Sequence, residues 1–88
     1  MPSRAIKQPN GLYARFSTVV DDLTDYDCPR EELWNIFRDE GGITFANRKM
    51  ESADQHTYRF EEALRIIGAL HGKSKADGYR DFLTKPLS

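Results

Sequence analysis

Residues 4–17 read RAIKQPNGLYARFS and predict the β-hairpin with which the fold begins. Between the two short segments lies Pro9-Asn10-Gly11, which is typical of a three-residue hairpin loop, because proline presets φ at the first position and glycine takes the left-handed one. A loop of this length pairs Ile6 with Ala14, whereas a two-residue loop would pair Ile6 with Arg15. We favour the first register because it places the apolar side chains of both segments on one face.

The alternation of the second segment predicts which of its side chains are buried. Successive residues of a strand point to opposite faces, and the apolar positions share one of these faces. We expect the core-facing side chains to be Leu12, Ala14 and Phe16. The expected outward-facing side chains are Tyr13, Arg15 and Ser17, which makes Tyr13 and Arg15 candidates for a binding surface.

After the hairpin comes an acidic segment, residues 21–27, with the sequence DDLTDYD. It places four carboxylates and one tyrosine in seven positions, and we expect it to be a loop that leads into a helix. Residues 21–40 together carry eight acidic and two basic side chains, a net charge of −6, while the rest of the chain sums to +5. Such a polarised small protein suggests a binding surface more than it suggests catalysis.

Three uses of the acidic segment are open. It can be a solvated connector in which one aspartate caps the next helix, or a partner surface in which carboxylates surround an aromatic anchor, Tyr26. The third use is a Ca²⁺ or Mg²⁺ site, but the segment has no glycine for the sharp turn of an EF-hand loop. We therefore expect no metal and no other cofactor. The candidate partner-binding residues are Tyr13, Arg15, Asp21, Asp22, Asp25 and Tyr26.

Helical periodicity follows the acidic segment. Pro29 and the two glutamates after Arg30 indicate a helix start, and the apolar stripe predicts a helix over 29–40. Gly41-Gly42 ends it. The alternation over 43–47 fits a third short strand, and a loop is the alternative for these five residues.

Two more helices are expected in the C-terminal half. A capping-box pattern at Ser52 and an apolar stripe that ends at Gly72 predict the longest helix of the chain. A shorter helix is expected from about 75 to 83, after a Ser74 cap. Its inward-facing side chains are predicted to be Tyr79, Phe82 and Leu83.

These elements predict one compact α+β domain over residues 1–88, in which an N-terminal hairpin, with or without the third strand, packs against two or three helices. A chain of 88 residues has one core and little material for a deep, closed active site, so we expect no enzyme. Cys28 is the only cysteine, which excludes an internal disulfide and fits a reducing compartment. Without an apolar export signal or a membrane-spanning run, the expected location is a cytoplasm.

Nucleic-acid binding is the alternative function, and its candidate contacts are Arg48, Lys49 and Arg59. Such binding requires basic residues on one face, with aromatic side chains for stacking. In the C-terminal half, however, acidic residues such as Glu51 and Glu61 are interleaved with the basic ones, which is typical of a solvated helix surface. We therefore rank protein binding first.

Residues 4–26, from the hairpin through the acidic segment to Tyr26, resemble the opening of small accessory proteins of bacteriophages and prophages. The resemblance covers only this N-terminal part and carries no catalytic residues with it. It implies a class of function, since such proteins are often inhibitors or modulators of a host machine, including anti-CRISPR and other anti-defence factors. The partner implied is a host protein, and the location implied is the cytoplasm of the bacterial host.

Overall fold

The structure is a computed structural model that describes residues 3–85. A three-stranded antiparallel sheet with the spatial order β1-β2-β3 comes first in the chain, and its strands are β1 (Ser3–Lys7), β2 (Tyr13–Ser17) and β3 (Asp22–Cys28). Four helices follow within the described residues: α1 (Arg30–Gly41), α2 (Ile43–Gln55), α3 (Arg59–His71) and α4 (Lys73–Thr84). This order confirms the predicted α+β class, with four helices where two or three were expected.

The hairpin has the predicted register. Ile6 pairs with Ala14, and the backbone N–H of Gln8 donates to the carbonyl of Leu12 at 2.8 Å, which closes the loop between them. Gly11 has a φ of 88°, a left-handed conformation that glycine adopts without steric cost. The local chemistry of the turn therefore determines how β1 and β2 face each other.

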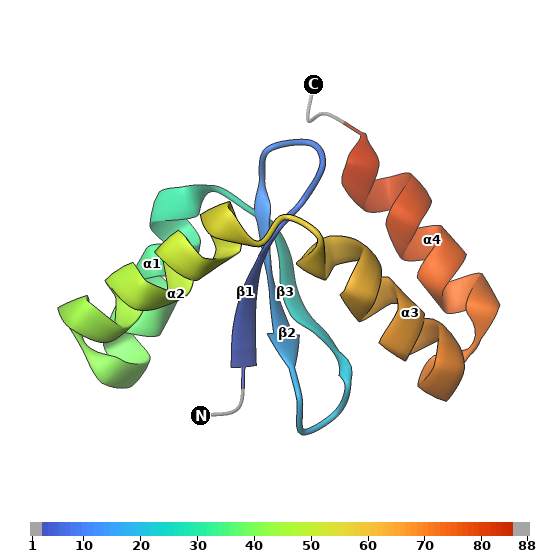
Figure 1. Ribbon diagram of the computed structural model, residues 1–88, viewed down its shortest axis with the longest axis horizontal. Helices are drawn as coiled ribbons and strands as arrows, with labels where there is room; N and C mark the ends of the chain where they lie inside the picture. The colour runs from blue at the N-terminus through green and yellow to red at the C-terminus, as the bar shows by residue number, and fades with distance from the viewer. Residues whose placement is uncertain (1–2, 86–88) are drawn as a thin grey trace.

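Both faces of the sheet are covered by helices. Figure 1 shows the sheet between two helical pairs, with α1 and α2 on one side and α3 and α4 on the other. Because alternate strand residues point to opposite faces, each face contributes to its own core. The core beside α3 and α4 includes Ile6, Ala14, Phe16, Phe60, Leu64, Ile67 and Leu83. The core beside α1 and α2 includes Ala5, Tyr13, Cys28, Leu33, Phe37 and Met50.

This arrangement corrects the expected exposure of β2. Phe16 is buried as predicted, with 3% of its surface exposed, but Tyr13 is also buried, with 4% exposed, so its predicted position at the surface is wrong. The prediction assumed that water covers one face of the hairpin, whereas α1 and α2 cover it. Arg15 is half-buried for the same reason. Leu12, which was expected in the core, is only half-buried.

The third strand lies at a different place from the predicted one. Residues 43–47 belong to α2, and the strand is instead the acidic segment, with Asp25 opposite Arg15 and Leu23 opposite Phe16. Two irregularities of register lie along this pair of strands, and Asp27 has a left-handed backbone with a φ of 53°. The loop predicted at 21–27 is therefore largely an edge strand of the sheet.

The single helix predicted from Ser52 to Gly72 is in fact two helices. α2 ends at Gln55 and α3 begins at Arg59. Ser52 lies in the last turn of α2, where its carbonyl accepts a hydrogen bond from the N–H of His56. The capping-box pattern therefore marks no helix start here.

The first and last helices lie close to their predicted positions. α1 confirms the helix over 29–40, and Pro29 directly precedes its first residue. α4 contains the helix predicted over 75–83 but begins directly after Gly72, so Ser74 is not its cap. Leu83 is buried as predicted, whereas Phe82, which was also expected to face inward, is 58% exposed.

Candidate functional site

The structure divides the six candidate partner residues between the two sides of the sheet. On the side of α1 and α2 lie Tyr13, Arg15 and Asp25. Asp22 and Tyr26 contact α4 on the other side. Asp21 lies in the turn between β2 and β3, with a φ of 52°. The hairpin and the acidic segment therefore do not form the one continuous surface that the sequence predicted.

Tyr13 is part of a structural network. Its hydroxyl donates to Oδ1 of Asp54 in α2, and Arg30 of α1 donates from Nε and Nη2 to Oδ2 of the same carboxylate, at 3.2 and 3.1 Å. Burial raises the pKa of Tyr13, and the hydrogen bond to Asp54 raises it further. This network connects β2 to both α1 and α2. The Tyr13 side chain is buried and is not accessible to a partner.

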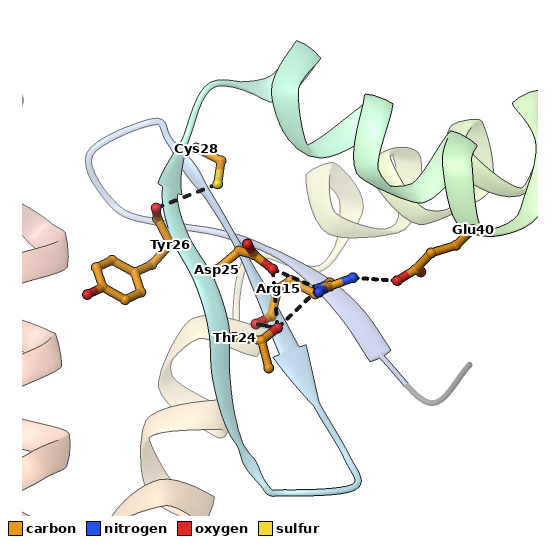
Figure 2. A network of polar contacts seen from close by, with 6 residues as sticks. All are labelled: Arg15, Thr24, Asp25, Tyr26, Cys28 and Glu40. Carbon is orange, nitrogen blue, oxygen red and sulfur yellow. Dashed lines mark hydrogen bonds and ion pairs between the residues drawn. The ribbon is translucent and has the colours of Figure 1, made fainter.

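Arg15 is the centre of an ion-pair network that joins β2, β3 and α1 (Figure 2). Its Nε lies 2.9 Å from Oδ2 of Asp25 and donates to the Thr24 hydroxyl oxygen at 3.0 Å, while its Nη1 contacts the Glu40 carboxylate. The side chains of Arg15, Asp25 and Glu40 are only 23%, 31% and 17% exposed. Partial burial strengthens the attraction between such charges and removes part of their hydration. The charge of Arg15 is thus paired with those of Asp25 and Glu40 inside the fold.

Asp22 joins the start of β3 to α4. Its carboxylate pairs with Nζ of Lys75 and accepts a hydrogen bond from the Tyr79 hydroxyl at 3.2 Å. Burial raises the pKa of Asp22, but hydrogen bonds from Lys75 and from the Leu23 N–H lower it by more, so the pKa lies below its ordinary 3.8. Burial, followed by the charge of Asp22, raises the pKa of Tyr79. At neutral pH a charged Asp22 therefore positions both Lys75 and the neutral Tyr79.

Three aromatic side chains meet between β3 and α4. The ring centroid of Tyr26 lies 6.1 Å from that of Tyr79 and 6.1 Å from that of Phe82, both in edge-to-face geometry. In Figure 2 the Tyr26 ring points away from the Arg15 network. The rings border a shallow surface hollow of about 370 Å³ that is widely open to solvent, and we call its lining residues the β3–α4 surface: Tyr26, Lys75, Gly78, Tyr79 and Phe82.

The β3–α4 surface retains Tyr26 from the predicted site and adds residues of α4 that the prediction missed. Phe82 was expected to face inward together with Tyr79 and Leu83. The periodicity of α4 does contain the correct signal, since Ala76 and Leu83 are separated by two helical turns and both are buried. Phe82 lies beside this stripe, and it is exposed.

The three basic residues that were candidates for nucleic-acid binding differ in their exposure and in their contacts within the fold. Arg48 is exposed on α2, and Arg59 is half-buried at the start of α3. Lys49 donates from Nζ to the Ser3 carbonyl at 2.5 Å, and its Nζ lies 5.3 Å from the centroid of the Phe45 ring. Burial, together with the charges of Arg59 and Arg4, lowers the pKa of Lys49. Lys49 is thus engaged within the fold, and nucleic-acid binding stays a prediction.

Cys28 lies at the end of β3 with 7% of its surface exposed. Burial raises the pKa of its thiol, and the charges of Glu32 and Asp25 raise it further, so the thiolate that nucleophilic chemistry requires is disfavoured. Within residues 3–85, no cluster of three or more histidine, cysteine, aspartate and glutamate side chains is arranged to hold a metal ion. No helix in the described part of the chain is both long enough and apolar enough to cross a membrane.

Comparison with known proteins gives no assignment. No protein-family model matches the chain, and neither does any curated protein or any solved structure. The residues and geometry of the β3–α4 surface are therefore the observations on which a function can rest.

Proposed function

We propose that the chain is a non-enzymatic protein-binding module and that the β3–α4 surface contacts its partner. The observation that carries the proposal is the exposure of Tyr26 and Phe82, at 46% and 58%, beside one surface hollow. Aromatic side chains supply a large contact area with few rotatable bonds, and tyrosine and tryptophan are enriched among the residues that dominate the energy of protein interfaces.

Polar groups at the border of the aromatic rings support the same function. Asp22 and Lys75 form an ion pair there, with 18% and 41% of their side chains exposed, and Nζ of Lys75 lies 5.9 Å from the centroid of the Tyr79 ring. An apolar centre with a polar, partly solvated rim is the usual anatomy of a protein interface. The rim helps to set the orientation of the partner, and the rings supply most of the contact energy.

The class of partner follows from the resemblance of residues 4–26 to phage accessory proteins. That resemblance supports a host protein as the partner, encountered in the bacterial cytoplasm. In this role the chain inhibits or redirects the host protein by occupying one of its surfaces. Components of host defence systems are the candidates that the resemblance favours.

A pulldown from a bacterial lysate, compared between two variants, tests the proposal. Phe82→Ala removes an exposed ring from the β3–α4 surface, and Ile43→Ala removes an apolar side chain of similar exposure, 62%, from α2. We expect a protein that the wild type and Ile43→Ala retain and that Phe82→Ala loses. Both variants should keep nearly the wild-type melting temperature, because truncation of an exposed side chain costs little stability. Equal retention by all three proteins contradicts the proposal.

A further inference from the structure

Gly78 lies in the interior of α4, where the helix itself gives no reason for a glycine. Glycine in a helix interior lowers stability relative to alanine, because it loses more backbone entropy on folding. A glycine is justified where φ is positive or where a Cβ would collide with a neighbour. Neither reason holds for Gly78, which is not among the glycines of positive φ and at which an added Cβ would meet no atom within 4 Å.

Gly78 is one of the residues that line the hollow of the β3–α4 surface. The absence of a Cβ at this position therefore leaves space in the hollow. The rest of the lining is mainly aromatic, from Tyr26, Tyr79 and Phe82. A volume of about 370 Å³ is large enough for one bulky side chain, and rings in edge-to-face contact offer both faces and edges to another apolar group. The chemistry of the hollow therefore suits a large aliphatic or aromatic side chain.

Charges of both signs lie around the hollow: Lys75, in its lining, is paired with Asp22, while the carboxylate of Asp27, outside the lining, lies toward the end of α4. The Asp27 carboxylate accepts hydrogen bonds from the side-chain amides of Gln8 and Asn10, at 2.8 and 3.3 Å. The same two amides also donate to the carbonyls of Leu83 and Lys85, so Asp27 lies beside the last turn of α4.

Asp27 has no cationic partner in the described part of the chain. The nearby Lys85 is instead paired with Asp81, at 3.3 Å. The carbonyl end of a helix is itself partly negative, and it adds to the charge of Asp27. This end of the β3–α4 surface therefore favours a positive side chain.

We infer that the β3–α4 surface receives a segment of another protein that carries one large apolar side chain next to a lysine or arginine. The apolar side chain fills the hollow against Gly78, and the basic one lies against Asp27. This inference rests on the proposed function and specifies which chemistry the partner presents.

Chemical-shift titration of the nitrogen-15-labelled full chain tests the inference with three capped pentapeptides, GKFKG, GEFEG and GKAKG. We expect GKFKG at millimolar concentration to shift the amide signals of Tyr26, Gly78 and Phe82. GEFEG should bind about fivefold more weakly, as expected for a reversed charge in a largely solvated site. GKAKG should produce no saturable shift, because it lacks the apolar side chain.

Three variants connect the titration to the structure. Gly78→Ala places a methyl group in the hollow and should weaken GKFKG binding about fivefold or more, while its melting temperature stays equal to or above that of the wild type. Gly68→Ala, at a glycine of α3 outside the lining, should bind as the wild type does. Asp27→Asn keeps the Oδ1 acceptor and a residue type that tolerates positive φ, and it should abolish the preference for GKFKG over GEFEG.

The other outcomes overturn the inference. Equal binding of GKFKG and GEFEG to the wild type would remove the role of Asp27, and an unaffected Gly78→Ala would remove the role of the hollow. If neither peptide shifts these amides while Phe82→Ala still loses its protein in the pulldown, the inference fails and the proposed function stands. If the pulldown also shows no difference between variants, both fail.

Discussion

The hydroxyl of Tyr13 in β2 donates a hydrogen bond to Asp54 near the end of α2. The aromatic ring is enclosed by the core beside α1 and α2, while the hydroxyl reaches the carboxylate that also holds Arg30. One side chain thus combines apolar burial with a charge-assisted hydrogen bond, and it does so between the sheet and the first helical pair. Tyr13 is therefore a structural residue, and its truncation should be costly.

Two substitutions at Tyr13 separate the hydrogen bond from the packing. Tyr13→Phe keeps the ring and should lower the free energy of unfolding by about 1.5–3 kcal/mol, the value of one hydrogen bond to a charged group. Tyr13→Ala also empties a core position and should cost about 3–5 kcal/mol. Urea denaturation measures both. A loss below about 0.5 kcal/mol for Tyr13→Ala, as at a surface position, would show that the ring is not buried.

The hairpin could be predicted because its determinants are local, whereas the environment of Tyr13 could not. Pro9-Asn10-Gly11 sets the loop and the register through three adjacent residues. Whether the outer face of β2 meets water depends on α1 and α2, which lie far from it in the sequence. α1 was predicted, but α2 was missed because the alternation over 43–47 was interpreted as a strand. No glycine or proline separates α2 from α3, so the end of α2 was joined to α3 as one long helix.

The strand character of the acidic segment depends on residues far away in the sequence. Aspartate is depleted in strands, and a run of aspartates therefore favours a loop. In β3 the charge of Asp22 is neutralised by Lys75, and that of Asp25 by Arg15. Asp27 sits in a left-handed position that aspartate tolerates. These compensations are tertiary, and local sequence reasoning has no access to them.

Arg15→Met should destabilise the fold by leaving two carboxylates without their shared cation. Methionine retains most of the stem, so the change tests the charge more than the packing. Asp25 and Glu40 are each less than one third exposed, and we expect a loss of about 1–3 kcal/mol in the free energy of unfolding. Adding Glu40→Gln to Arg15→Met should recover part of the loss in urea denaturation. Strict additivity of the two substitutions would show that these residues do not interact.

Gly78→Ala should stabilise the isolated protein. Alanine improves the helix interior of α4, and its Cβ would meet no neighbouring atom, so the expected gain is about 0.5–1 kcal/mol. The matched substitution Gly68→Ala has the same effect on helix propensity, but its Cβ would lie 3.4 Å from the Cβ of Ala76, and its gain should be smaller. Thermal unfolding at neutral pH ranks the two variants. A destabilised Gly78→Ala would mean that position 78 is closely packed.

Acid should unfold the protein partly through Asp22 and Asp54. At Asp22, burial raises the pKa, but the hydrogen bonds from Lys75 and Leu23 lower it by more; at Asp54, burial is likewise outweighed by the hydrogen bonds from Tyr13 and Arg30. Both folded-state pKa values therefore lie below the ordinary 3.8, and the unfolded chain binds protons more readily. The stability that these groups contribute is fully present well above pH 3.8 and is lost as the pH falls through that value toward the folded-state pKa.

The double variant Asp22→Asn, Asp54→Asn should therefore be less stable than the wild type at neutral pH and should lose less stability between about pH 5 and pH 2. Asp21→Asn is the matched control, because Asp21 adjoins Asp22 but forms no ion pair within residues 3–85. Urea denaturation repeated across this pH range gives the free energy of unfolding of each protein. If the double variant and the wild type lose the same amount of stability in acid, other carboxylates govern acid unfolding and the ion pairs of Asp22 and Asp54 contribute little.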